Sequence, residues 1–146
     1  MRPFPLLAAL LALAGCGGAD PAPSAAPTAT VRLNPVPSRP AAGYFEVRAD
    51  GDRGALLSVT SPQAARVEMH ETTASGAMSG MRRLERIPVR DGETLTFAPG
   101  GRHLMVFDID RRVAAGGRID LVLHFERGAA LTVPAVLVPT GGDVGR

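Results

Sequence analysis

The sequence has very little of several residues on which common functional sites depend. Cys16 is the only cysteine among 146 residues, tryptophan is absent, and all sixteen basic residues are arginine. A single cysteine excludes an internal disulfide, a cysteine-ligated blue-copper centre, a zinc ribbon and a CxxC redox pair in the folded domain. Cysteine chemistry therefore does not explain what this domain does.

Charge and aromatic side chains are also too sparse for several functions. The net charge is +2, the aromatic residues are one tyrosine and five phenylalanines, and the arginines are scattered apart from Arg82, Arg83 and Arg86. Nucleic-acid binding needs a denser basic stripe with aromatic residues between, so we expect no nucleic-acid partner. Those three arginines either dock an acidic partner or form a solvated surface. We also expect no enzyme, because no catalytic triad, spaced acidic pair or phosphate-binding loop is evident.

The N-terminus carries the one continuous apolar run of note, Leu6 to Ala14. About nine residues are too few to span a bilayer, which takes roughly 20, and the run is typical of a secretory signal. It ends in Leu13-Ala14-Gly15-Cys16, which resembles the bacterial lipobox. We therefore expect a signal peptide over residues 1–15 and a lipid on Cys16; the alternative is ordinary cleavage nearby, with Cys16 discarded or left free.

Residues 16–40 are rich in Pro, Ala and Gly and predict a lipidated tether. The expected location is the cell envelope, facing the periplasm and anchored to a membrane by the N-terminal lipid. Gly17 after the cysteine is compatible with the outer membrane. The folded domain is expected over residues 41–140.

Within this domain, short apolar runs recur about every ten residues between turn residues. They are GYFEVRA, ALLSVTS, ARVEMHE, GMRRLE, TLTFA, HLMVFDI, RIDLVLHFE and LTVPAVLV. Regularly spaced short strands with Gly, Pro and Asp between them predict an all-β sandwich or barrel with little or no helix.

Alternation along two of these runs places chemically active side chains together. Glu68 and His70 share one face of their strand, and His103 and Met105 share one face of theirs. Two side chains of one strand can bind the same metal ion only if they lie on the same face, and residues two positions apart in a strand do so. In the run from residue 103 to residue 109 both faces are apolar at first, so periodicity does not decide which face is core.

The longer spacing links these residues into one pattern, H-x10-M-x21-H-x-M, formed by His70, Met81, His103 and Met105. This pattern resembles the PCu(A)C family of periplasmic copper chaperones. The flanking segments AAGYFEV, SPQAARVEMH and LTFAPGGRHLM are similar to that family as well, and the resemblance covers roughly residues 41 to 137. It implies a cupredoxin-like (Greek-key) β-sandwich that binds Cu(I) through these four residues.

The ligand types agree with that implication. A thioether is neutral and polarisable, so a site with methionine ligands favours Cu(I) over zinc, magnesium or calcium, while imidazole accepts either copper oxidation state. By resemblance, the recipient would be the copper-A subunit of cytochrome c oxidase, with a Sco-type thiol protein as a possible second partner. Many family members carry a further methionine just after the first histidine, where this chain has Glu71 and Thr72.

Simpler interpretations exist for each residue type. A single methionine on an apolar strand usually packs in the core, and a single histidine usually forms a surface hydrogen bond. We expect those roles for Met69 and His124. We expect a loop position for Met78, with a reserve thioether ligand as the alternative. For the whole protein, the alternatives are an envelope protein that sequesters copper and a structural β-sandwich lipoprotein without metal.

Overall fold

The structure, a computed structural model, describes residues 29–76 and 78–141, and these form ten strands and no helix. The predicted signal peptide, Cys16 and the first part of the predicted tether lie outside the described residues. The strands are β1 (Ala29–Arg32), β2 (Ala41–Ala49), β3 (Ala55–Thr60), β4 (Ala64–Ser75), β5 (Met78–Leu84), β6 (Ile87–Pro88), β7 (Glu93–Phe97), β8 (Arg102–Ile109), β9 (Arg118–Phe125) and β10 (Leu131–Val138). No helix capable of spanning a membrane is found among the described residues.

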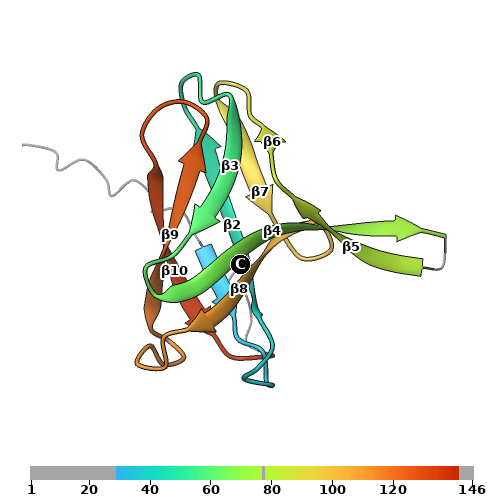
Figure 1. Cartoon of the computed structure of the whole chain (residues 1–146), viewed down its shortest axis with the longest axis vertical. Helices are drawn as coiled ribbons and strands as arrows, with labels where there is room; N and C mark the ends of the chain where they lie inside the picture. The colour runs from blue at the N-terminus through green and yellow to red at the C-terminus, as the bar shows by residue number, and fades with distance from the viewer. Residues whose placement is uncertain (1–28, 77, 142–146) are drawn as a thin grey trace, which may run out of the picture.

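One continuous sheet curls around a single core (Figure 1). Its strand order is β5-β4-β8-β2-β1-β10-β9-β3-β6, and β7 pairs with β2 beyond the end of the β2–β8 contact. All pairs are antiparallel except β1 with β10. Because β2 pairs first with β8 and then with β7, the sheet folds over at this strand into a sandwich. The predicted all-β sandwich is confirmed.

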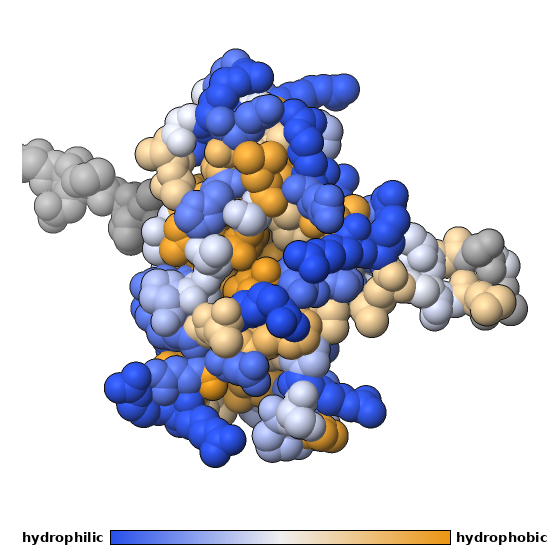
Figure 2. Space-filling view, in the orientation of Figure 1, coloured by the Kyte–Doolittle hydropathy of each residue, from blue (hydrophilic) through white to orange (hydrophobic). Residues whose placement is uncertain are grey.

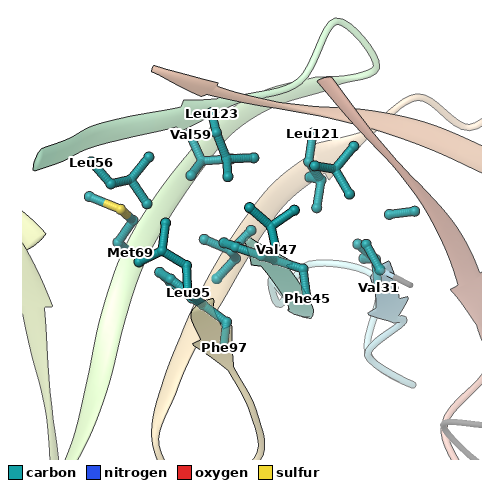
Figure 3. Packing of buried hydrophobic residues seen from close by; sticks show 14 of the residues in the cluster. Val31, Phe45, Val47, Leu56, Val59, Met69, Leu95, Phe97, Leu121 and Leu123 are labelled. Atoms are coloured by element: carbon teal, nitrogen blue, oxygen red, sulfur yellow. The ribbon is translucent and has the colours of Figure 1, made fainter. Parts of the chain in front are cut away.

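The core lies between the facing sides of the curled sheet (Figure 3). Phe45 of β2 stacks on Phe97 of β7 with ring centroids 4.3 Å apart, and Met69 of β4 is only 4% exposed. Burial of one such side chain contributes roughly 1.5–3 kcal/mol. Alternate residues of β9 point into this core, as the sequence pattern predicts.

The sheet includes two strands that the pattern did not reveal. β1 lies before the predicted domain start at residue 41, and it pairs with both β2 and β10. It is only four residues long and stands between proline-rich segments, so it shows no readable period. β6 has two residues. In β8 the structure also resolves which face is core, because Leu104 and Val106 are buried there.

Candidate metal centre

Strand register places the predicted ligands of β4 and β8 side by side. His70 pairs directly with His103, and Met105 lies opposite Glu68, two residues along β4 from His70. Directly opposed residues share a face of an antiparallel sheet, as do alternate residues of one strand. His70, His103 and Met105 therefore lie on one face. The other face presents Met69 and Leu104 to the core.

The fourth predicted ligand reaches the same face from the opposite side of β4. Met81 of β5 pairs with Thr72, which is two residues from His70 in the direction away from Glu68. The three-stranded unit β5-β4-β8 thus carries all four residues on one face, with His70 at the centre. Residues diagonally related in this way lie about 7–8 Å apart, within reach of long side chains such as methionine.

The two imidazole rings face each other across the β4–β8 pair. Their centroids are 6.1 Å apart and their planes are inclined by 33°. Imidazole nitrogens bind metal ions at about 2 Å, so a single ion bound to one nitrogen of each ring spans a separation of this size.

His103 has one nitrogen already engaged. Its Nδ1 lies 3.1 Å from the carbonyl oxygen of Gly101, and only 9% of the residue is exposed. A carbonyl only accepts hydrogen bonds, so Nδ1 carries the proton and donates it. The lone pair of His103 is consequently on Nε2, which is the atom left for a metal.

His70 has the opposite arrangement. Its Nε2 lies 3.0 Å from Oε2 of Glu68, and its Nδ1 is buried without a hydrogen-bond partner among the described residues. An ionised carboxylate only accepts, so Nε2 carries the proton and the lone pair is on Nδ1. Buried polar atoms without a partner are uncommon, and one with a lone pair beside a second histidine fits a metal ligand.

Glu68 is surrounded by positive charge. Its Oε1 lies 2.9 Å from Nε of Arg66 and 3.5 Å from Nη1 of Arg83, and the guanidinium of Arg66 also stacks 4.1 Å above the ring of Phe107. The hydrogen bond from His70 lowers the pKa of Glu68 below its ordinary value, the two arginines lower it further, and partial burial opposes them. Glu68 is therefore ionised and oriented at neutral pH.

The two thioethers differ in access to solvent. Met105 is partly buried, whereas Met81 is 62% exposed on the β4–β5 hairpin, which projects from the body of the domain (Figure 1). Figure 2 shows this hairpin standing clear of the body, whose visible face mixes hydrophilic and hydrophobic patches, with pale to moderately hydrophobic side chains along the hairpin. Because Met81 is so exposed, it does not pack in the core.

The structure also places the residues that we expected outside the site. His124 is hydrogen-bonded through Nε2 to Oγ1 of Thr60 at 2.8 Å, and Met69 packs in the core, so both predictions are confirmed. Met78 does not lie in a loop: it begins β5, is 80% exposed and pairs with Ser75. That register puts it on the face opposite to Met81.

The arginine cluster is bound to carboxylates of the domain itself. Arg82 pairs with Glu71 at 2.7 Å and Arg86 with Glu126 at 2.9 Å, while Arg83 contacts Glu68. The pairs of Arg82 and Arg86 are exposed and contribute little to stability, whereas Arg83 reaches the partly buried Glu68. The solvated-surface interpretation accounts for Arg82 and Arg86.

Sequence reasoning missed the two groups that orient the histidines. The sequence could have identified Glu68, because alternation along the strand places it on the same face as His70. The sequence could not have identified the Gly101 carbonyl, because the direction of this group depends on the turn before β8. Within the described residues, no group of three or more His, Cys, Asp or Glu side chains could hold a metal ion.

Comparison with known sequences then assigns a family. The profile of the family described as "Putative lipoprotein LpqE-like" matches residues 25–137. The chain belongs to the LpqE-like family. It is also similar to the "Putative lipoprotein Lxx21020" of Leifsonia xyli subsp. xyli (strain CTCB07), with 28% identity over 145 residues, covering 91% of this chain and 86% of that protein.

Solved structures resemble this LpqE-like protein over most of its length. The copper-bound PCuAC domain from PmoF2 is 25% identical to this chain and superposes with a TM-score of 0.59. The match covers 76% of this chain and 88% of that chain. The solution structure of CuI-DR1885 from Deinococcus radiodurans is 30% identical, with a TM-score of 0.57 and coverages of 84% and 83%. The resemblance to PCu(A)C proteins predicted from the sequence is confirmed.

Proposed function

We propose that this LpqE-like protein is a copper chaperone of the cell envelope that carries one Cu(I) ion at His70, Met81, His103 and Met105. The observation that supports this most directly is the shared face of β5-β4-β8, on which strand register gathers all four side chains. Both histidines present a nitrogen lone pair there. Two similar structures, the PmoF2 domain and DR1885, were solved with copper.

The donor set suits Cu(I) as cargo. Two neutral imidazoles and two thioethers give a complex of charge +1 and contribute no hard anionic ligand, which disfavours zinc, magnesium and calcium. Glu68 does not enter the ligand set, because its two oxygens are occupied by His70, Arg66 and Arg83.

The exposure of Met81 supports transfer over storage. A ligand at the solvent surface can be replaced by a donor from another protein while the other three ligands still hold the ion. By analogy with PCu(A)C proteins, we propose the copper-A centre of cytochrome c oxidase as the recipient and a Sco-type thiol protein as a candidate second partner. A lipid on Cys16 would hold the chaperone at the membrane, facing the periplasm.

Deletion of the gene tests this function in the cell. Under copper limitation we expect the deletion strain to lose cytochrome c oxidase activity and the copper-A absorption, and the wild-type gene to restore both. A Met81→Ala gene should restore much less than a Met78→Ala gene, its matched control. A deletion strain with normal oxidase that is merely sensitive to excess copper would refute delivery and favour sequestration.

A further inference from the structure

Glu68 is held at three points, and this fixes the orientation of His70. Arg66 on the same strand and Arg83 on β5 contact Oε1, while Oε2 accepts the hydrogen bond from His70. Arg66 is itself restrained by its stacking on Phe107. A carboxylate anchored from two directions has little freedom to rotate, so it presents Oε2 to His70 in a constant position.

The extended backbone determines which nitrogen of His70 this carboxylate engages. Glu68 and His70 are two residues apart on the same face of β4, and the glutamate side chain reaches the outer nitrogen, Nε2. The inner nitrogen, Nδ1, then remains buried and unpartnered within the described part of the chain. A flip of the ring would cost the charge-assisted hydrogen bond to Glu68.

His103 is fixed in the opposite sense by a backbone group. Its Nδ1 donates to the Gly101 carbonyl, so Nε2 is the atom with a lone pair. The facing pair of histidines is therefore asymmetric before any metal arrives.

From this geometry, and resting on the proposed copper site, we propose that Glu68 is a positioning residue that makes His70 bind copper through Nδ1 while His103 binds through Nε2. A carboxylate that receives the outer N–H of a metal-bound histidine orients the ring and increases its basicity. Loss of such a partner commonly lowers metal affinity by about 10–100-fold.

Nitrogen NMR tests the assignment directly. Long-range ¹H–¹⁵N correlation spectra of ¹⁵N-labelled protein distinguish a protonated ring nitrogen from one with a lone pair, and Cu(I) is diamagnetic. In the copper-free protein we expect His70 to be protonated at Nε2 and His103 at Nδ1. Anaerobic loading with one equivalent of Cu(I) should then shift His70 Nδ1 and His103 Nε2. His70 protonated at Nδ1, or both rings bound through the same nitrogen, would overturn the proposal.

Variants of Glu68 test whether it causes this asymmetry. In Glu68→Ala we expect mixed tautomers of His70, an unchanged His103, and Cu(I) affinity reduced by about 10–100-fold. Glu68→Gln retains an acceptor oxygen and should largely restore the His70 tautomer. The matched control is Glu71→Ala, which removes the same charge from the other face of β4, where Glu71 pairs with Arg82. Equal effects of Glu68→Ala and Glu71→Ala would refute a positioning role.

The same measurements separate this proposal from the proposed function. If the wild-type protein binds no Cu(I), the proposed function fails and the assignment of copper-binding nitrogens fails with it, although the copper-free spectra still report whether Glu68 fixes His70. If the wild-type protein binds Cu(I) and Glu68→Ala changes neither affinity nor tautomer, the positioning role fails and the function stands.

Discussion

Individual side chains of one type have different roles here because their neighbours differ. Nε2 of His124 is hydrogen-bonded to the hydroxyl of Thr60. His70 and His103 each donate a hydrogen bond from one ring nitrogen and keep a lone pair on the other. The long spacing predicted which histidines to single out. It did not predict the tautomers, because these depend on Gly101 and Glu68 contacts that form only when the strands pair.

Alanine substitutions of Met81 and Met69 should have opposite effects: the first weakens Cu(I) binding, and the second weakens the fold. Met81→Ala should weaken Cu(I) binding by at least about tenfold, as loss of a ligand costs no less than loss of its supporting partner. It should leave the free energy of unfolding nearly unchanged, because Met81 is 62% exposed. Met69→Ala should instead lower that free energy by roughly 2–5 kcal/mol, because it opens a cavity in the core. Urea unfolding and Cu(I) competition measure the two quantities, and a reversed pattern would contradict the assignment.

The exposed pair Asp110–Arg112 predicts a pH dependence. The side-chain hydrogen bonds from Arg112, with its backbone N–H, lower the pKa of Asp110 from its ordinary 3.8 to about 2. A carboxyl whose pKa is lower in the folded protein stabilises the fold above its unfolded pKa, and the contribution disappears as pH falls from about 4 towards about 2. The contribution is small because solvent screens the pair.

Carboxyl ¹³C titration by NMR measures this pKa. In Arg112→Ala we expect the pKa of Asp110 to rise part of the way towards 3.8, since the backbone N–H of residue 112 still donates. An unchanged pKa in that variant would show that the guanidinium is not the cause.

At the scale of elements, β4 is the strand on which the site depends. It lies between β5, its sequence neighbour, and β8, which comes much later in the chain. The pattern of short apolar runs predicted β4, β5 and β8, and alternation predicted that His103 and Met105 share a face. The sequence pattern could not predict that β8 pairs with β4 in the register that aligns His70 with His103. Nor could it predict β1, which is too short to show a period.

Close approach between β2 and β8 gives a prediction at this scale. A Cβ added at Gly43 would lie 3.0 Å from Cβ of Leu104, an atom that moves only with its backbone. Because Leu104 stands between His103 and Met105, Gly43→Ala should shift β8, lower the free energy of unfolding by about 1–3 kcal/mol and weaken Cu(I) binding. Gly80→Ala is the control, since its Cβ would meet only Oγ1 of Thr73, at 3.4 Å. Equal stability of the two variants would contradict this account.

At the scale of the whole molecule, the sandwich supplies the packed body and the projecting β4–β5 hairpin supplies the exposed end of the proposed copper site. The core fixes β4 and β8 through residues such as Met69 and Leu104, whose side chains point away from the site. The exposed Met81 would extend the proposed donor set to the surface. The all-β class followed from the spacing of apolar runs, while the projecting hairpin could not be predicted, because its exposure depends on how the sheet curls.

The most direct test of this account is an anaerobic titration of the domain with Cu(I) against a competing chelator. We predict one tight equivalent per molecule, weakened by alanine at each of His70, Met81, His103 and Met105 and unaffected by His124→Ala. Absence of tight binding, or binding that none of the four substitutions changes, would contradict the copper site.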